Sequence, residues 1–129
     1  MSKICTTIEQ SKKLMELGLD IKTADMNWHS FDNIKPFVRA FPYVHENGAI
    51  EGILPAWSLS ALLELMPNEL ELLSDECNFV PVLSRFCEDT DKFICCYDNG
   101  AMEHWYIEKE PLDAVYKMVC WLLENGYIK

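Results

Sequence analysis

The stretch "EPLDAVYKMVCWLLENGYIK" (110–129) decides the fold, because it predicts a helix with apolar side chains on nearly every side. Pro111 suits the first helical position, Asp113 suits the positive N-terminal end, and Gly126 ends the helix. One apolar face recurs at helical spacing and consists of Leu112, Val115, Tyr116, Val119, Leu122 and Leu123. A second apolar flank consists of Ala114, Met118 and Trp121, which leaves a narrow polar stripe of Asp113, Lys117 and Glu124. Such a helix must be covered on more than one side, either between a sheet and another helix or at a subunit interface.

Capping residues predict two further helices upstream. Thr7 and Gln10 form a capping box before an amphipathic stretch that Gly18 ends. In "LPAWSLSALLELMP" (54–67), Ser58 precedes an apolar stripe at helical spacing. A hydrolase would need small residues around a nucleophilic serine, as in G-x-S-x-G, and this stretch lacks them. Ser58 is therefore interpreted as a helix N-cap with Trp57 packed before it.

Two Asn-Gly pairs predict tight hairpins. Asn47-Gly48 would join a strand near 37–45 to one near 49–54. Asn99-Gly100 lies in "KFICCYDNGAMEHWYIEK" (92–109), where a two-residue loop would place Cys95 directly opposite His104. Residues 69–86 add one or two short strands, and no parallel βαβ alternation is visible. The sequence thus predicts one α+β domain over 1–129: an antiparallel sheet, built from the two hairpins and short strands, with about three helices packed on one face.

Charge is unevenly distributed along the 129 residues, whose formal net charge is −10. Residues 1–45 carry six Lys/Arg and five Asp/Glu, whereas residues 46–129 carry five Lys/Arg and sixteen Asp/Glu. The acidic part would repel phosphate backbones, so we expect no nucleic acid as a partner. A basic partner would suit it if the carboxylates shared one face. An acidic inhibitor that mimics DNA is therefore one functional hypothesis.

Cysteine usage predicts a cytoplasmic protein without a membrane partner. The first ten residues lack the apolar segment of a secretory signal, and no apolar run approaches the roughly 18 residues that cross a bilayer. The six cysteines are then expected to be reduced thiols. No C-x-x-C, H-x-x-x-H or glycine-rich phosphate loop occurs, so we predict no metal site and no cofactor.

Cys95 and His104 form the sharpest catalytic hypothesis. As cross-strand neighbours, they would place an imidazole where it could take the proton of a thiol, as in a Cys-His enzyme. No third group is evident to orient the histidine, and a half-buried pair without catalytic function is the alternative. The leading hypothesis is a non-enzymatic protein-interaction module that binds an unknown protein or itself as a homodimer, because the last helix is so apolar. The candidate binding residues are Trp57, Trp105 and Trp121.

Three segments also carry a resemblance: "TIEQSKKLMELGLDIKTADM", "LPAWSLSALLELMP" and "PLDAVYKMVCWLLENGYIK". Together they are similar to a family of small uncharacterised proteins encoded by gut bacteria, their phages and mobile elements. The ending "WLLENGYI" is the most specific part. The resemblance implies a cytoplasmic protein from a mobile element, and it implies no particular chemistry.

Overall fold

The structure, a computed structural model, describes residues 3–40, 52–67, 80–98 and 104–128. Over these ranges the helices are α1 (Ile8–Glu16), the short 3-10 helix η1 (Ile21–Thr23), α2 (Leu59–Leu65) and α3 (Pro111–Glu124). The strands are β1 (Met26–His29), β2 (Phe37–Arg39), β3 (Ile53–Ala56), β4 (Val80–Phe86), β5 (Asp89–Asp98) and β6 (His104–Glu108).

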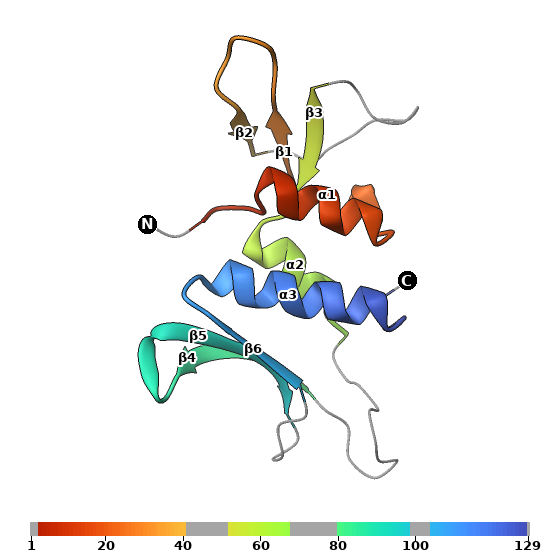
Figure 1. Ribbon diagram of the computed structural model, residues 1–129. Coiled ribbons are helices and arrows are strands. Elements are labelled where there is room, and N and C mark those ends of the chain that lie inside the picture. Colours follow the sequence, from red (N-terminus) through yellow and green to blue (C-terminus); the bar gives the residue numbers. More distant parts are fainter. Residues whose placement is uncertain (1–2, 41–51, 68–79, 99–103, 129) are drawn as a thin grey trace.

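The described strands form two antiparallel sheets of three strands each, in the orders β2-β1-β3 and β4-β5-β6. Figure 1 shows the helices as a layer between them: β1–β3 lie beyond α1, and β4–β6 lie beyond α3. The predicted α+β class is confirmed. The expectation of one sheet with helices on one face differs from this arrangement, because the strands divide between the two sides of the helical layer.

The helix boundaries follow from the capping residues. The Thr7 hydroxyl accepts a hydrogen bond from the Gln10 amide, and the Gln10 side chain accepts one from the Thr7 amide, which completes the capping box. Ser58 caps α2 through the amide of Ala61. Pro111 begins α3 as predicted. Gly126 follows the end of α3 with a φ of 76°, a conformation that glycine adopts without strain.

Helix α3 is covered by its own chain. It contacts β5 and β6 on one side and α2 on another. Its buried residues are Leu112, Ala114, Val115, Met118, Val119 and Leu122. Lys117 and Glu124 of the predicted polar stripe are exposed. The sequence allowed two arrangements for this helix, either between a sheet and another helix or at a subunit interface. The structure shows the first. None of the helices within the described ranges is long and apolar enough to cross a bilayer.

The N-terminal sheet departs from the predicted hairpin. The Asn47-Gly48 turn lies outside the described residues, and the strands that flank it, β2 and β3, are not neighbours. Strand β1 lies between them, with Trp28 opposite Val38 on one side and Leu54 on the other. The sequence analysis missed β1 because "MNWH" is short and mixes polar with apolar residues.

The C-terminal sheet confirms that β5 and β6 are antiparallel neighbours but corrects their register. Cys95 pairs with Tyr106, and His104 pairs with Tyr97, so the predicted pairing of Cys95 with His104 is wrong by two residues. The predicted Asn99-Gly100 turn lies outside the described residues. An even shift leaves each side chain on the face that was expected, because side chains alternate with a period of two.

Candidate functional site

The predicted catalytic pair is not arranged as a nucleophile and its base. The side chain of Cys95 is 0% exposed, and it packs in the core beneath α3. Burial, with a smaller contribution from Cys96, raises the pKa of the Cys95 thiol to about 12. A thiol with that pKa stays protonated near neutral pH, and the protonated form is a poor nucleophile. The shifted register also moves His104 from the position opposite Cys95 to a diagonal one.

His104 instead belongs to an aromatic stack between β6 and α3. The centre of its ring lies 4.0 Å from that of Trp121, with an angle of 18° between the planes. Trp121 also stacks with Tyr127, and the centres of these two rings lie 5.5 Å apart. The Nε2 atom of His104 is 3.0 Å from the hydroxyl of Tyr106. Burial lowers the pKa of His104 below its ordinary value. Trp121, a predicted binding residue, therefore joins the last helix to the sheet.

Trp57 and Ser58 also have structural roles. Trp57 is fully buried, and its indole N–H donates a hydrogen bond to the hydroxyl of Thr23 at 2.9 Å. The amide of Ser58 donates to the carboxylate of Asp25 at 2.8 Å, and the Ser58 hydroxyl donates to the same carboxylate. Asp25 thus holds the start of α2 against the segment before β1. This confirms the interpretation of Ser58 as an N-cap, and it places Trp57 in the core.

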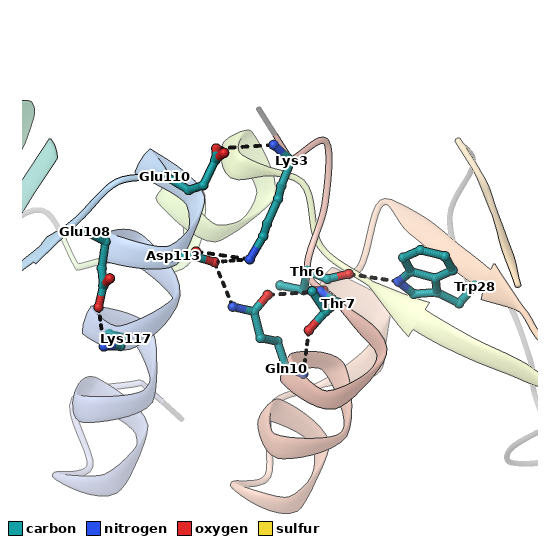
Figure 2. A network of polar contacts seen from close by, with 9 residues as sticks. All are labelled: Lys3, Thr6, Thr7, Gln10, Trp28, Glu108, Glu110, Asp113 and Lys117. Atoms are coloured by element: carbon teal, nitrogen blue, oxygen red, sulfur yellow. Dashed lines mark hydrogen bonds and ion pairs between the residues drawn. The ribbon is translucent and has the colours of Figure 1, made fainter. Parts of the chain in front are cut away.

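A polar network fastens the N-terminal segment to the start of α3 (Figure 2). Asp113 accepts hydrogen bonds from the ammonium of Lys3 at 2.9 Å and from the side-chain amide of Gln10 at 2.9 Å. Glu110 accepts from the backbone amide of Lys3 at 3.3 Å. Because Gln10 also completes the capping box of α1, this network positions both helices.

Several carboxylates of the described residues are thus engaged within the chain. Lys117 pairs with Glu108, Lys92 lies 3.9 Å from Asp89, and Asp113 binds Lys3. Seven further carboxylates fall outside the described ranges, at 46, 51, 69, 71, 75, 76 and 103. The acidic inhibitor hypothesis requires one continuous acidic face. The hypothesis stays a prediction, and none of the contacts among the described residues supports it.

Half of the exposed large apolar residues in the described ranges lie in the hairpin of β1 and β2. Of the six large hydrophobic side chains that are exposed in the described ranges, three lie here: Phe31 at 45%, Ile34 at 56% and Phe37 at 39%. The exposed Lys35 and Arg39 lie among them. We call these five residues the hairpin surface. Monomeric proteins seldom expose several large apolar residues together without a binding role.

The hairpin surface has a defined ring arrangement. The His29 ring stacks on Phe37 at 5.1 Å with an interplanar angle of 11°, and it lies 6.0 Å from Phe31 in a tilted contact. The guanidinium carbon of Arg39 lies 6.0 Å from the centre of the Phe37 ring. Burial, and then the charge of Arg39, lowers the pKa of His29, so the neutral imidazole is favoured. These contacts orient the rings of His29, Phe31 and Phe37 relative to one another.

A shallow pocket of about 300 Å³ lies beside these rings and is lined by Ser30, Phe31, Asp32 and Gly52. The amide of Ser30 donates to the carbonyl of Gly52 at 2.7 Å, which ties the loop to the residue before β3. Gly52 has a φ of 85°, and a Cβ atom there would lie 2.8 Å from the Phe31 ring. Glycine at this position therefore lets Phe31 lie close to the backbone.

Sequence reasoning missed the hairpin surface. Near "FVRAFPY" (37–43), aromatic residues occur with the cations Lys35 and Arg39, but two cations are too few for a nucleic-acid groove, and the pattern itself predicts no protein-binding surface. The exposure of Phe31, Ile34 and Phe37 depends on β1 and β2 pairing at one end of the molecule. A one-dimensional pattern does not contain that information. Of the three predicted binding residues, Trp105 is exposed, at 47%, whereas Trp57 is buried and Trp121 is partly buried.

Among the residues that the structure describes, no three His, Cys, Asp or Glu side chains lie close enough together to hold a metal ion. Comparison of the chain with protein-family models, with curated proteins and with solved structures gives no match.

Proposed function

We propose that this protein is a cytoplasmic, non-enzymatic interaction module that binds another protein through the hairpin surface. The observation that carries the proposal is the grouping of Phe31, Ile34 and Phe37, all exposed, on one short hairpin. Large apolar and aromatic side chains supply most of the energy at protein interfaces, because they exclude water over a wide area. The loop of a hairpin is also a common place for binding residues that a rigid scaffold positions.

The chemistry of the hairpin surface defines the partner. Phe31, Ile34 and Phe37 require an apolar patch, and Lys35 and Arg39 favour carboxylates around that patch. We therefore expect an acidic partner protein with an exposed apolar centre. A nucleic acid is disfavoured, because the chain as a whole carries a formal charge of −10 and would be repelled by a phosphate backbone.

The Cys-His enzyme is the weaker hypothesis. It requires a reactive thiolate, whereas Cys95 is fully buried and its thiol has a pKa raised to about 12. The cytoplasmic location is part of this proposal and rests on the lack of a secretory signal in the first ten residues. An origin in gut bacteria, phages or mobile elements is what the resemblance of the three segments implies.

The test is a quantitative pull-down from lysate of the native host with tagged wild-type protein and two variants. The first variant combines Phe31→Ser with Phe37→Ser. The second is Leu63→Ser, which removes an exposed apolar side chain from α2 and serves as the matched control. We expect one stoichiometric acidic partner with the wild type and the control. The double variant should bind it at least about tenfold more weakly, as for the loss of a hot spot.

Lys35→Glu tests the charge of the partner separately. It should weaken binding to the purified partner, and added salt should reduce the difference from the wild type. A partner that the double variant retains at wild-type affinity would refute the role of the hairpin surface. Turnover of a substrate that depends on Cys95 would refute the non-enzymatic proposal.

A further inference from the structure

The two edges of the C-terminal sheet differ in how they are protected against pairing with another strand. Edge strand β4 contains Pro81, which has no N–H to donate, and its register with β5 is irregular between Arg85 and Phe86. Prolines and bulges are the usual features that prevent edge-to-edge association. Edge strand β6 has neither, and it pairs with β5 in unbroken register from His104 to Glu108.

In the described ranges no strand lies on the far side of β6. Every second residue of an antiparallel edge strand directs its N–H and C=O away from its neighbour, so β6 presents a row of backbone donors and acceptors. The side chains alternate between the two faces of the sheet. Tyr106 lies on the face toward α3, and Trp105 lies on the opposite face with 47% of its side chain exposed.

The sequence of β6, "HWYIE", is complementary to itself when it is read in the antiparallel direction. A two-fold axis at Tyr106 would place Trp105 opposite Ile107 of the partner subunit and His104 opposite Glu108 of the partner subunit. The first pair is apolar on both sides, and the second combines an imidazole with a carboxylate. Apolar cross-strand pairs favour antiparallel pairing, and an imidazole N–H can donate a hydrogen bond to a carboxylate on the opposite strand.

We propose that two copies of this chain associate edge to edge through β6 and form one continuous antiparallel sheet of six strands. The occupant is a second copy because the strand matches itself in apolar character and in side-chain hydrogen bonding about a single two-fold axis. Such a closed, isologous contact stops at two subunits. It places both α3 helices on the same face of the joined sheet and covers Trp105. This inference does not rest on the hairpin surface, which lies in the other sheet.

The first test is sedimentation equilibrium of the purified full chain across the micromolar range. Wild-type protein should form dimers, and added salt should strengthen them by screening the repulsion between two acidic copies. Trp105→Lys places a charge in the proposed contact without touching the buried core, and it should weaken dimerisation at least about tenfold. Ser84→Lys adds the same charge to the other edge strand and should leave dimerisation unchanged.

The second test examines the register. Cα atoms directly opposite each other in an antiparallel pair lie about 4.5–5.5 Å apart, which a disulfide can span. Tyr106→Cys, in a Cys87→Ser background, should therefore form a disulfide between two copies after oxidation with diamide. Peptide mapping should find the introduced thiols joined to each other. Ser84→Cys in the same background is the control and should give no such link.

A monomer at every concentration would overturn the proposal. A dimer that Trp105→Lys leaves intact, or a cross-link that forms equally with Ser84→Cys, would also overturn it. Circular dichroism of each variant should match the wild type, and Tyr106→Cys should unfold at a lower temperature because it removes a ring that packs against the core. If Trp105→Lys fails to fold, the disulfide at position 106 still decides the question.

Discussion

The two sheets of this protein use apolar side chains for different purposes. In the C-terminal sheet, β5 has four consecutive buried residues from Ile94 to Tyr97, so apolar side chains are covered on both faces of that strand. In the N-terminal sheet, β1 has one buried residue, Asn27, and β2 has none. Burial of this kind stabilises the fold, whereas exposed aromatic residues on a short hairpin remain available for binding. The comparison distinguishes a strand that is buried on both faces from a hairpin that leaves its large apolar side chains exposed.

The largest predicted difference in stability is between replacing a core tryptophan and replacing an aromatic residue of the hairpin surface. Trp57→Ala should lower the free energy of unfolding by about 3–5 kcal/mol, because it leaves a cavity in the core. It also leaves the hydroxyl of Thr23 without the indole donor. Phe37→Ala should change the free energy by no more than about 1 kcal/mol. Urea unfolding followed by circular dichroism measures both. Equal losses would show that the hairpin aromatics belong to the core.

A second contrast concerns the free thiols of the C-terminal sheet. Cys95→Ser would bury a hydroxyl among apolar groups and should cost about 1–3 kcal/mol of stability. Cys87→Ser should be neutral within about 0.5 kcal/mol, because Cys87 is exposed. In the native wild type, Ellman's reagent should react with Cys87 far faster than with Cys95. Rapid labelling of Cys95 in the folded protein would contradict its burial and revive the Cys-His enzyme.

The helices could be predicted from the sequence because their signals are local. A capping box at Thr7, an N-cap at Ser58 and a proline at position 111 each involve neighbours within one turn. The division into two sheets could not be predicted, since it depends on β1 inserting between β2 and β3. The predicted register of β5 with β6 was wrong because it assumed the two-residue loop that is typical of an Asn-Gly turn. The packing of Tyr97 and Tyr106 beneath α3 selects a different register.

The candidate site shows the same limit. Burial distinguishes Trp57 from Trp105, and the sequence offers both as tryptophans beside apolar residues. The apolar flanks of α3 left open whether a sheet and another helix or a second subunit covers them, and the contacts with β5, β6 and α2 show the first arrangement. The polar bond from Gln10 to Asp113 joins residues that are 103 positions apart, and no local pattern signals it. Long-range contacts therefore decide the site, whereas short-range ones decide the elements.

A third prediction tests how the N-terminal segment is attached to the helical layer. Asp113→Ala removes the acceptor shared by Lys3 and Gln10 and should cost about 1 kcal/mol, since the side chains are only partly buried and the ion pair is screened. Asp89→Ala removes an exposed partner of Lys92 and should have almost no effect. Urea unfolding at low and high salt provides the measurement. A larger loss with Asp89→Ala would contradict this ranking.

The smallest predicted effect on the free energy of unfolding concerns one histidine in each sheet. Burial lowers the pKa of His104, whereas burial together with the charge of Arg39 lowers the pKa of His29. Because the pKa is lowered in the folded state, the unfolded chain binds more protons than the folded chain at acidic pH. The contribution of each histidine to the free energy of unfolding is therefore fully present above the ordinary pKa of 6.5, and it is lost as the pH falls through that value. Unfolding free energies at about pH 7.5 and about pH 5.5 should therefore differ less for His104→Phe and His29→Phe than for the wild type.

Added salt distinguishes the two causes of the lowered pKa values, because burial acts on both histidines and the charge of Arg39 acts on His29. Repulsion between a protonated His29 and Arg39 is a charge–charge interaction near solvent, so added salt should reduce the part of the acid sensitivity that His29→Phe removes. The part that His104→Phe removes comes from desolvation between Trp121 and Tyr106, which salt does not screen. The two variants should thus respond differently to the same change of ionic strength. An identical salt response would mean that His104 also faces a nearby cation, and the aromatic stack would no longer account for its lowered pKa.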